Sequence, residues 1–235
     1  ALLEQDVMIK GDKRMMERIL APSILSADFK VLGEQMELCE KSGAKYLHFD
    51  VMDGMFVKNL SFGVPVLASI QGHTGLVMDV HLMIEEPIRY AEAFANAGAD
   101  ILTVHYEACE NLQETVDKIH ACGMKAGITI KPDTPVDVLM PYLDQAEMFL
   151  IMSVEPGKGG QKFIPESLEK IRTLRALLEE RGLHTDIEVD GGIGLDNVKT
   201  VLDAGANVIV AGSAVFKGDL SENVSEFVRI FEEDE

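Results

Sequence analysis

Short apolar strings alternate with amphipathic stretches along most of the chain. Eight strings have the length and the β-branched or aromatic content of buried strands: residues 19–25, 46–52, 77–83, 101–107, 125–131, 148–154, 186–192 and 207–213. Between several of them apolar residues recur with the helical period, in residues 28–44, 87–99, 111–123, 165–182 and 195–206. Most of these helical stretches run into a glycine, which favours the end of a helix.

This alternation predicts an α/β fold of the (β/α)8 TIM-barrel type, because each strand is followed by a helix or a helical turn. An open, doubly wound sheet is the alternative. The pattern contains no linker between domains, so we expect a single barrel domain from residue 17 to residue 235. Residues 1–16 lack the pattern and are expected to be a disordered extension or a cloning remnant, with Met15 or Met16 as the natural start.

Composition narrows the class of protein. The chain is 47% hydrophobic, and no apolar run approaches the ~20 residues of a membrane-spanning helix. Its first residues lack the apolar core of a secretory signal, and its three cysteines are widely spaced without a CxxC pair. These features predict a cytoplasmic protein. The formal charge of −19 argues against nucleic acid and anionic membranes as partners.

The segment "HFDVMDGMFV" (residues 48–57) carries the first candidate chemistry. His48, Asp50 and Met52 share one face of a strand, because residues i and i+2 point the same way. Adjacent ionisable groups facing an interior are costly unless a metal, a hydrogen-bond network or chemistry stabilises them. His81 and Asp190 stand on two other predicted strands, so these side chains can converge as ligands of Zn, Fe(II), Mn or Co. The alternative is that each histidine is a hydrogen-bonded core residue.

Further polar residues are predicted at strand ends, where TIM barrels carry their active sites. These are Ser23, His105, Glu107, Lys131 and Glu155.

Glycines cluster after the last three predicted strands, in "EPGKGGQ" (155–161), at Gly191 and Gly192, and in "AGS" (211–213). Their backbone N–H groups can approach an anion closely, so the pattern predicts a phosphate site at this side of the barrel. Such a site needs no basic patch, which agrees with the acidic composition. The alternative is that these glycines only permit tight turns.

Several motifs together resemble the ribulose-phosphate 3-epimerase family: "ILAPSILSADF", "LHFDVMDGMFVKNLSFG", "VHLMI", "MSVEPGKGGQKF", "IEVDGGI" and "VAGSAVF". The resemblance runs from residue 18 to about residue 230. It implies a TIM barrel of the ribulose-phosphate-binding type that interconverts D-ribulose 5-phosphate and D-xylulose 5-phosphate in the pentose phosphate pathway. It also implies one divalent metal ion and a homo-oligomer.

The resemblance assigns roles to individual positions. Asp50 and Asp190 match the two catalytic acid–base residues, and with His48 and His81 they match the metal ligands. The substrate-binding positions of the family match Ser23, Met52, Met83, Met152, Gly157, Gly159, Gly160, Gly191, Gly192, Gly212 and Ser213.

These residues permit epimerisation at C3. One aspartate removes the proton beside the ketone, the metal stabilises the resulting enediolate, and the other aspartate returns a proton to the opposite face. The methionines could form a dry wall, and residues 155–163 could close over the site.

Three positions depart from the family pattern. Lys158 replaces an aromatic residue, Met55 a histidine and Lys58 a proline. These departures do not affect the expected metal ligands. They concern substrate specificity and the closure of the loops around the substrate.

Three other functions stay open. The first is D-allulose-6-phosphate 3-epimerase, which shares the motifs. The second is a Schiff-base lyase or aldolase with Lys131 as nucleophile. The third is a barrel that binds a sugar phosphate without converting it.

Overall fold

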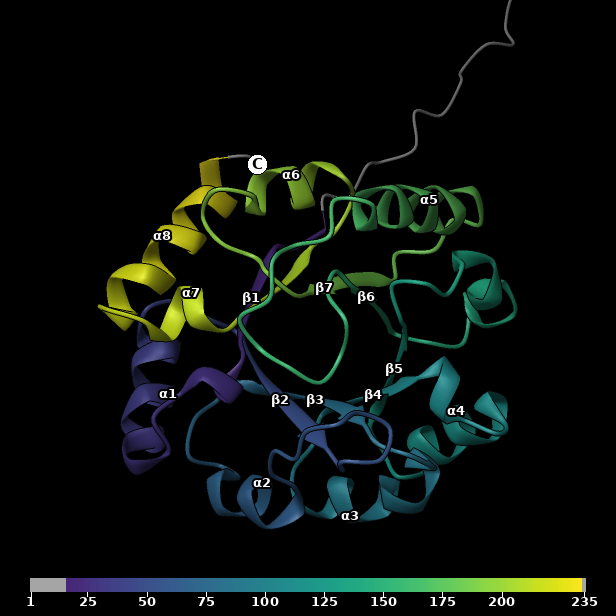
Figure 1. Ribbon diagram of the computed structural model, residues 1–235, viewed down its shortest axis with the longest axis horizontal. Coiled ribbons are helices and arrows are strands. Elements are labelled where there is room, and N and C mark those ends of the chain that lie inside the picture. The colour runs from purple at the N-terminus through teal and green to yellow at the C-terminus, as the bar shows by residue number, and fades with distance from the viewer. Residues whose placement is uncertain (1–15, 234–235) are drawn as a thin grey trace, which may run out of the picture.

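Eight parallel strands form the centre of the computed structural model, which describes residues 16–233 (Figure 1). The strands are β1 (Ile19–Pro22), β2 (Tyr46–Met52), β3 (Val77–Met83), β4 (Ile101–His105), β5 (Lys125–Ile130), β6 (Met148–Met152), β7 (Asp186–Asp190) and β8 (Val208–Ala211). Around them lie α1 (Leu32–Lys41), α2 (Val64–Ile70), α3 (Ala91–Asn96), α4 (Leu112–Ala121), α5 (Ser167–Glu180), α6 (Val198–Asp203), α7 (Ser213–Phe216) and α8 (Leu220–Glu233). Short 3-10 helices span Ile24–Ser26, Phe29–Val31, Pro87–Tyr90, Tyr106–Ala108 and Val136–Tyr142.

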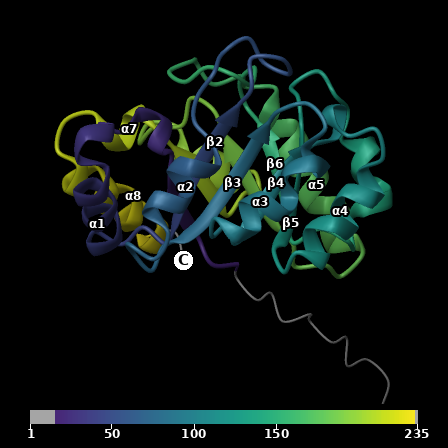
Figure 2. The same ribbon diagram turned by 90° about the horizontal axis from the view of Figure 1, so that it is seen from below.

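The sheet closes into a barrel. Its strand order is β1-β8-β7-β6-β5-β4-β3-β2, with parallel pairing throughout. The first and last strands of this order meet where Lys45 N donates to Leu20 O at 3.4 Å and where Ser23 pairs with His48 in a parallel bridge. The predicted (β/α)8 barrel is confirmed, and the open doubly wound sheet is wrong. Figure 2 shows the helices flanking the barrel from a second direction.

The main hydrophobic core lies between the barrel wall and the helices. Leu47, Phe49 and Val51 of β2 face this layer and are almost fully buried. The alternate residues of β2 face the barrel interior, where a small apolar cluster that includes Tyr46 and Met148 fills one level. The same alternation directs the polar residues of β2, β3 and β7 inward, so the interior combines an apolar layer with a buried polar layer.

Several strands end earlier than the sequence predicts. β2 and β3 have the predicted bounds, but β1 ends at Pro22, β4 at His105 and β8 at Ala211. Ser23 accepts a hydrogen bond from Leu25 N with its side chain, which starts a 3-10 helix directly after β1. Glu107 likewise lies in a 3-10 turn and not on a strand. At the end of β1, a local bond between side chain and backbone thus replaces a sheet bond.

The helical layer contains elements that the periodicity did not single out, namely α2, α7 and most of α8. Two exposed residues, Glu232 and Glu233, end α8. Within residues 16–233, no helix has the length and apolar character needed to cross a membrane. The expectation for residues 1–16 falls almost wholly outside the described part of the chain.

A substitution at Gly127 tests how closely β4 and β5 pack inside the barrel. Gly127 faces Thr103 across the β4–β5 pair, and an added Cβ would lie 2.9 Å from the Cβ of Thr103 and 3.1 Å from its Cα. We expect Gly127→Ala to lower the free energy of unfolding by about 1–3 kcal/mol through overpacking. The control is Gly63→Ala, whose Cβ would meet no atom within 4 Å. Equal stability of the two variants in urea unfolding would contradict this packing.

Candidate active site

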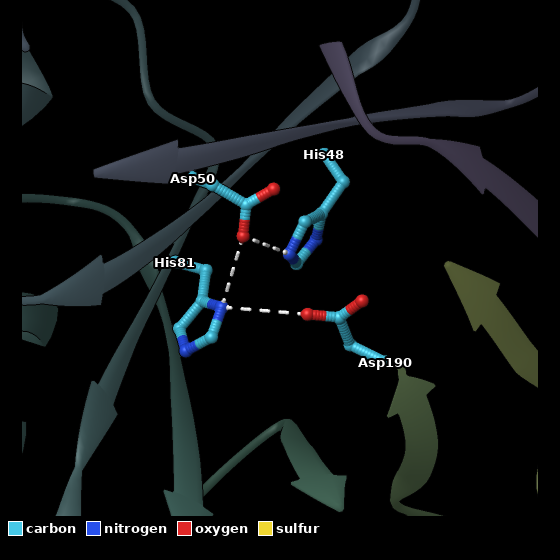
Figure 3. A group of neighbouring side chains, drawn as sticks. All are labelled: His48, Asp50, His81 and Asp190. Carbon is cyan, nitrogen blue, oxygen red and sulfur yellow. Dashed lines mark ion pairs between the residues drawn. The ribbon is translucent and has the colours of Figure 1, made fainter. Parts of the chain in front are cut away.

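Four side chains from three strands meet inside the barrel. His48, Asp50, His81 and Asp190 point toward one another in Figure 3. Each offers one ligand atom, and these atoms lie within 4.8 Å of one another. Asp50 Oδ1 lies 3.3 Å from both His48 Nε2 and His81 Nδ1, while Asp190 Oδ2 lies 4.0 Å from His81 Nδ1. The sequence prediction that these four residues converge is therefore correct in geometry.

Strand register explains this convergence. Asp50 pairs with His81 across the β2–β3 ladder, and His48 shares the inward face of β2 with Asp50. Asp190 is the last residue of β7 and reaches the cluster from a strand that β8 and β1 separate from β2. A slip of one residue in any of these strands would turn the side chain out of the interior.

The two carboxyl groups have different electrostatic environments. Burial works to raise the pKa of Asp50, but the His48 and His81 imidazoles outweigh it and hold that pKa well below its usual range. Burial raises the pKa of Asp190 to about 6, and the nearby charge of Asp50 adds to this effect. Ser23 also donates a hydrogen bond of 2.5 Å from Oγ to Asp50 Oδ2, which further stabilises the ionised carboxylate.

Two buried acids stand behind His48, and sequence reasoning missed both. Asp79 Oδ2 lies 2.5 Å from His48 Nδ1, and Glu188 Oε1 lies 3.5 Å from the same nitrogen. Both acids are fully buried. Burial and the charge of Asp79 raise the pKa of Glu188 well above its ordinary value. The sequence did contain the information needed to predict them. Asp79 precedes His81 by two residues and Glu188 precedes Asp190 by two, so each acid shares the inward face of its strand with an expected ligand.

The donor set fits a divalent cation. His48 Nε2 and His81 Nδ1 are buried and make no hydrogen bond of normal geometry in the described structure, although both face the same carboxylate oxygen. In the neutral form of His48, the contact of Nδ1 with Asp79 holds the ring's proton on Nδ1, and the Nε2 lone pair is then directed at the cluster. Two imidazole nitrogens and two carboxylate oxygens are ligands that zinc, iron(II), manganese and cobalt accept.

A cavity of about 320 Å³ opens beside the four residues. Every residue that the sequence predicts to bind substrate lines it, together with both aspartates: Ser23, Met52, Met83, Met152, Gly157, Gly159, Gly160, Gly191, Gly192, Gly212 and Ser213. Ser26, Gln161, Asp196 and Ala214 also line the cavity and were not anticipated. Gln161, Asp196 and Ala214 lie in or beside the segments of the predicted glycines, whereas Ser26 follows β1 and comes close to Gly212 only in the folded barrel.

Gly191 and Gly192 follow β7 with φ angles of +127° and +67°, which favour glycine. A Cβ on Gly191 would lie 2.9 Å from Val154 N, and one on Gly192 would lie 2.8 Å from Phe163 Cα. Glycine is thus required here because the loops after β6 and β7 pack backbone against backbone. This contact brings the two loops together at the cavity.

The departures from the family pattern lie on exposed positions. Met55 is 71% exposed and Lys58 is also exposed, while Lys158 is an exposed residue in the lining of the cavity. Asn59 Nδ2, next to Lys58, donates to Gly157 O at 2.6 Å and joins the loop after β2 to the loop after β6.

Lys131 lies apart from this cavity. Its Nζ atom stands 4.1 Å from the ring centroid of Phe56, and the residue is absent from the cavity lining. The geometry therefore disfavours a Schiff-base function for this lysine.

Comparison with solved structures places the fold among known barrels. A variant of the tryptophan synthase α-subunit from Pyrococcus furiosus matches with a TM-score of 0.69 and 16% identity, over 91% of this chain and 100% of that one. Thiamine phosphate pyrophosphorylase from the same organism matches with a TM-score of 0.62 and 17% identity, over 92% and 96% of the two chains. At this level of identity the similarity concerns the fold alone.

Sequence relatives are much more similar. Ribulose-phosphate 3-epimerase of Synechocystis is 52% identical over 200 residues, which cover 84% of this chain and 87% of the relative. The Bacillus subtilis protein of that name is 48% identical over 209 residues, or 88% and 96% of the two chains. The family model described as the ribulose-phosphate 3 epimerase family matches residues 19–216. The chain thus belongs to the ribulose-phosphate 3-epimerase family of enzymes.

Proposed function

We propose that this epimerase interconverts D-ribulose 5-phosphate and D-xylulose 5-phosphate by two-base proton transfer at C3 and depends on one divalent metal ion. The observation that carries the proposal is the meeting of His48, Asp50, His81 and Asp190 beside a cavity lined by glycine-rich loops. The barrel acts as a single catalytic domain. A cytoplasmic location and assembly into a homo-oligomer stay predictions.

His48, Asp50, His81 and Asp190 would hold the divalent metal ion, which supplies Lewis-acid stabilisation of negative charge on the substrate oxygens. Asp79 holds the proton of His48 on Nδ1 and so keeps Nε2 available as a ligand. The set excludes none of zinc, iron(II), manganese and cobalt.

Asp50 and Asp190 exchange the proton at C3. They come from β2 and β7, which β1 and β8 separate in the barrel wall, so the two carboxyl groups approach the cavity from different sides. One carboxylate removes the proton, the other carboxyl group delivers a proton to the opposite face, and the roles exchange in the reverse direction. Ser23 orients Asp50 by its hydrogen bond to Oδ2.

The phosphate is bound by backbone N–H groups of the loops after β6, β7 and β8. Gly191, Gly192, Gly212 and Ser213 line the cavity there, and neutral amides recognise an anion despite the net charge of −19.

The remaining wall of the cavity limits the access of water. Met52, Met83 and Met152 supply an apolar, almost fully buried surface. The bond between Asn59 and Gly157 holds the loop segment 155–161 next to the loop after β2. Water excluded from the site cannot protonate the carbanionic intermediate from the wrong side.

The two-base scheme predicts that Asp50→Asn and Asp190→Asn each lower turnover by about 10³-fold or more, because an amide neither accepts nor delivers the C3 proton. Exchange of the C3 proton with deuterated solvent, followed by NMR, measures this step directly. Asp144→Asn, at an exposed position, is the matched control and should retain wild-type activity. Interconversion of the two epimers at a rate near that of the wild type by either active-site variant, with an intact circular dichroism spectrum, would refute the scheme.

Removal of the cation should lower turnover by about two orders of magnitude or more, since charge stabilisation of several kcal/mol is lost. A chelator-treated sample is assayed before and after addition of zinc, manganese, cobalt or iron(II), and the bound metal is counted by mass spectrometry. His48→Ala should bind less than one equivalent. Full activity of metal-free protein would contradict the proposed cofactor.

The proposed substrate is a pentulose phosphate, and the names of the sequence relatives support it. We expect kcat/KM on D-ribulose 5-phosphate to exceed that on D-allulose 6-phosphate by about tenfold or more, as one extra carbon in a fitted cavity commonly costs. Parallel NMR assays with both sugars decide the matter. A preference for the hexulose phosphate would overturn this choice of substrate and leave the mechanism intact.

A further inference from the structure

A chain of polar contacts leaves the four-residue cluster through His105 and Glu107. His105 ends β4 and is fully buried. Its Nε2 atom lies 2.9 Å from His81 Nε2, and the two rings stack with centroids 5.0 Å apart. On its other side, His105 Nδ1 lies 3.5 Å from Glu107 Oε2. Neither His105 nor Glu107 lines the substrate cavity, so a role in substrate contact does not explain them.

The contact between the two imidazoles constrains their protons. Two ring nitrogens at 2.9 Å hold a single proton between them, so one ring donates and the other accepts. If His81 donates from Nε2, its Nδ1 atom carries a lone pair toward Asp50 and Asp190. If His105 donates, the proton of a neutral His81 must sit on Nδ1, where it blocks a ligand bond.

Glu107 determines which of these arrangements is stable. Its Oε1 atom accepts hydrogen bonds from Lys131 N at 2.8 Å and from the Thr134 hydroxyl. The backbone N–H of Lys131 is a donor only, so it keeps an acceptor oxygen at this position. Partial burial works to raise the pKa of Glu107, but the nearby His105 imidazole and the hydrogen bonds from Thr134 and Lys131 lower it to about 2. The second oxygen of an ionised carboxylate therefore faces His105 Nδ1 and draws the proton there.

Surrounding residues isolate this chain of contacts. The Phe56 ring packs against His105 at a centroid distance of 4.8 Å and carries the Lys131 ammonium group near its face. Phe56 and Lys131 thus limit the access of water, which could otherwise donate or accept at either ring. The Glu107 side chain is 21% exposed, whereas both histidine side chains are fully buried.

We infer that Glu107 and His105 form a proton-orienting relay that keeps His81 in the tautomer with Nε2–H and a free Nδ1 lone pair. Glu107 is accordingly a positioning residue for a cation that it does not contact. The inference rests on the proposed function, because it assumes that His81 binds a cation through Nδ1. Asp79 holds the proton of His48 directly, on Nδ1, whereas Glu107 holds the proton of His81 on Nε2 through an additional imidazole.

The relay makes an unusual prediction for Glu107→Gln. The amide oxygen must stay on Lys131 N–H, which turns the NH2 group toward His105 Nδ1. This reverses the proton order and places a proton on His81 Nδ1. Glu107→Leu removes the bias without reversing it. We therefore expect cobalt(II) affinity to fall by about 10–100-fold in Glu107→Gln and by less in Glu107→Leu.

The experiment is a cobalt(II) titration of chelator-treated full-length protein, followed by the visible absorption of the bound ion and by competition with a chelator. Glu110→Gln, an exposed neighbour, is the matched control and should bind cobalt like the wild type. Urea unfolding of each variant without metal measures any loss of structure. A merely structural Glu107 gives the opposite order, since glutamine keeps the shape and the bond to Lys131 that leucine loses.

The outcomes separate the relay from the proposed cation centre. The relay is overturned if Glu107→Gln binds cobalt(II) with wild-type affinity, or if Glu107→Leu loses more affinity than Glu107→Gln. The cation centre still stands in that case, provided that the wild type binds cobalt(II) tightly and His81→Ala binds it weakly. Absence of cobalt binding by the wild type, or undiminished binding by His81→Ala, overturns the cation centre and with it the relay. Both the relay and the cation centre are supported if Glu107→Gln binds cobalt(II) more weakly than Glu107→Leu and the wild type, and if its stability in urea equals that of the wild type.

Discussion

The structure depends on one electrostatic constraint, which is the burial of Asp50 beside two imidazoles. Asp50 is 3% exposed, and an ionised carboxylate in such surroundings is stable only with close partners. The His48 and His81 nitrogens at 3.3 Å and the Ser23 hydroxyl supply these partners from separate segments of the barrel wall. Removal of any of them would leave a buried charge less well stabilised, so the same contacts serve both the fold and the proposed chemistry.

This constraint extends outward through layers of buried polar groups. Behind His48 stand Asp79 and Glu188, and behind His81 stands His105. The parallel register of β2 with β3 pairs His48 with Asp79 and Asp50 with His81 inside the barrel. An apolar layer around Tyr46 and Met148 fills the interior elsewhere. The barrel therefore gathers the buried polar groups in one region. There they stabilise one another and hold the imidazole rings in a fixed orientation.

The substrate side of the site follows a different principle. The chain has a net charge of −19, yet its family acts on a phosphorylated sugar. Glycine-rich loops after β6, β7 and β8 surround the cavity, and the positive φ angles of Gly191 and Gly192 permit their close packing. Backbone amides can thus bind an anion without a basic surface. The exposed Lys158 adds one positive charge at the lining of the cavity.

The sequence by itself determined the barrel and the inward direction of His48, Asp50, His81 and Asp190, because a strand repeats its side-chain direction every two residues. Its strand-end glycines also indicated the cavity. Only the tertiary structure decided that Asp79 and Glu188 support His48, that His105 meets His81, and that Lys131 lies over Phe56 outside the cavity. These contacts join different strands and loops, and they depend on register and closure of the barrel. Local periodicity carries no information about either property.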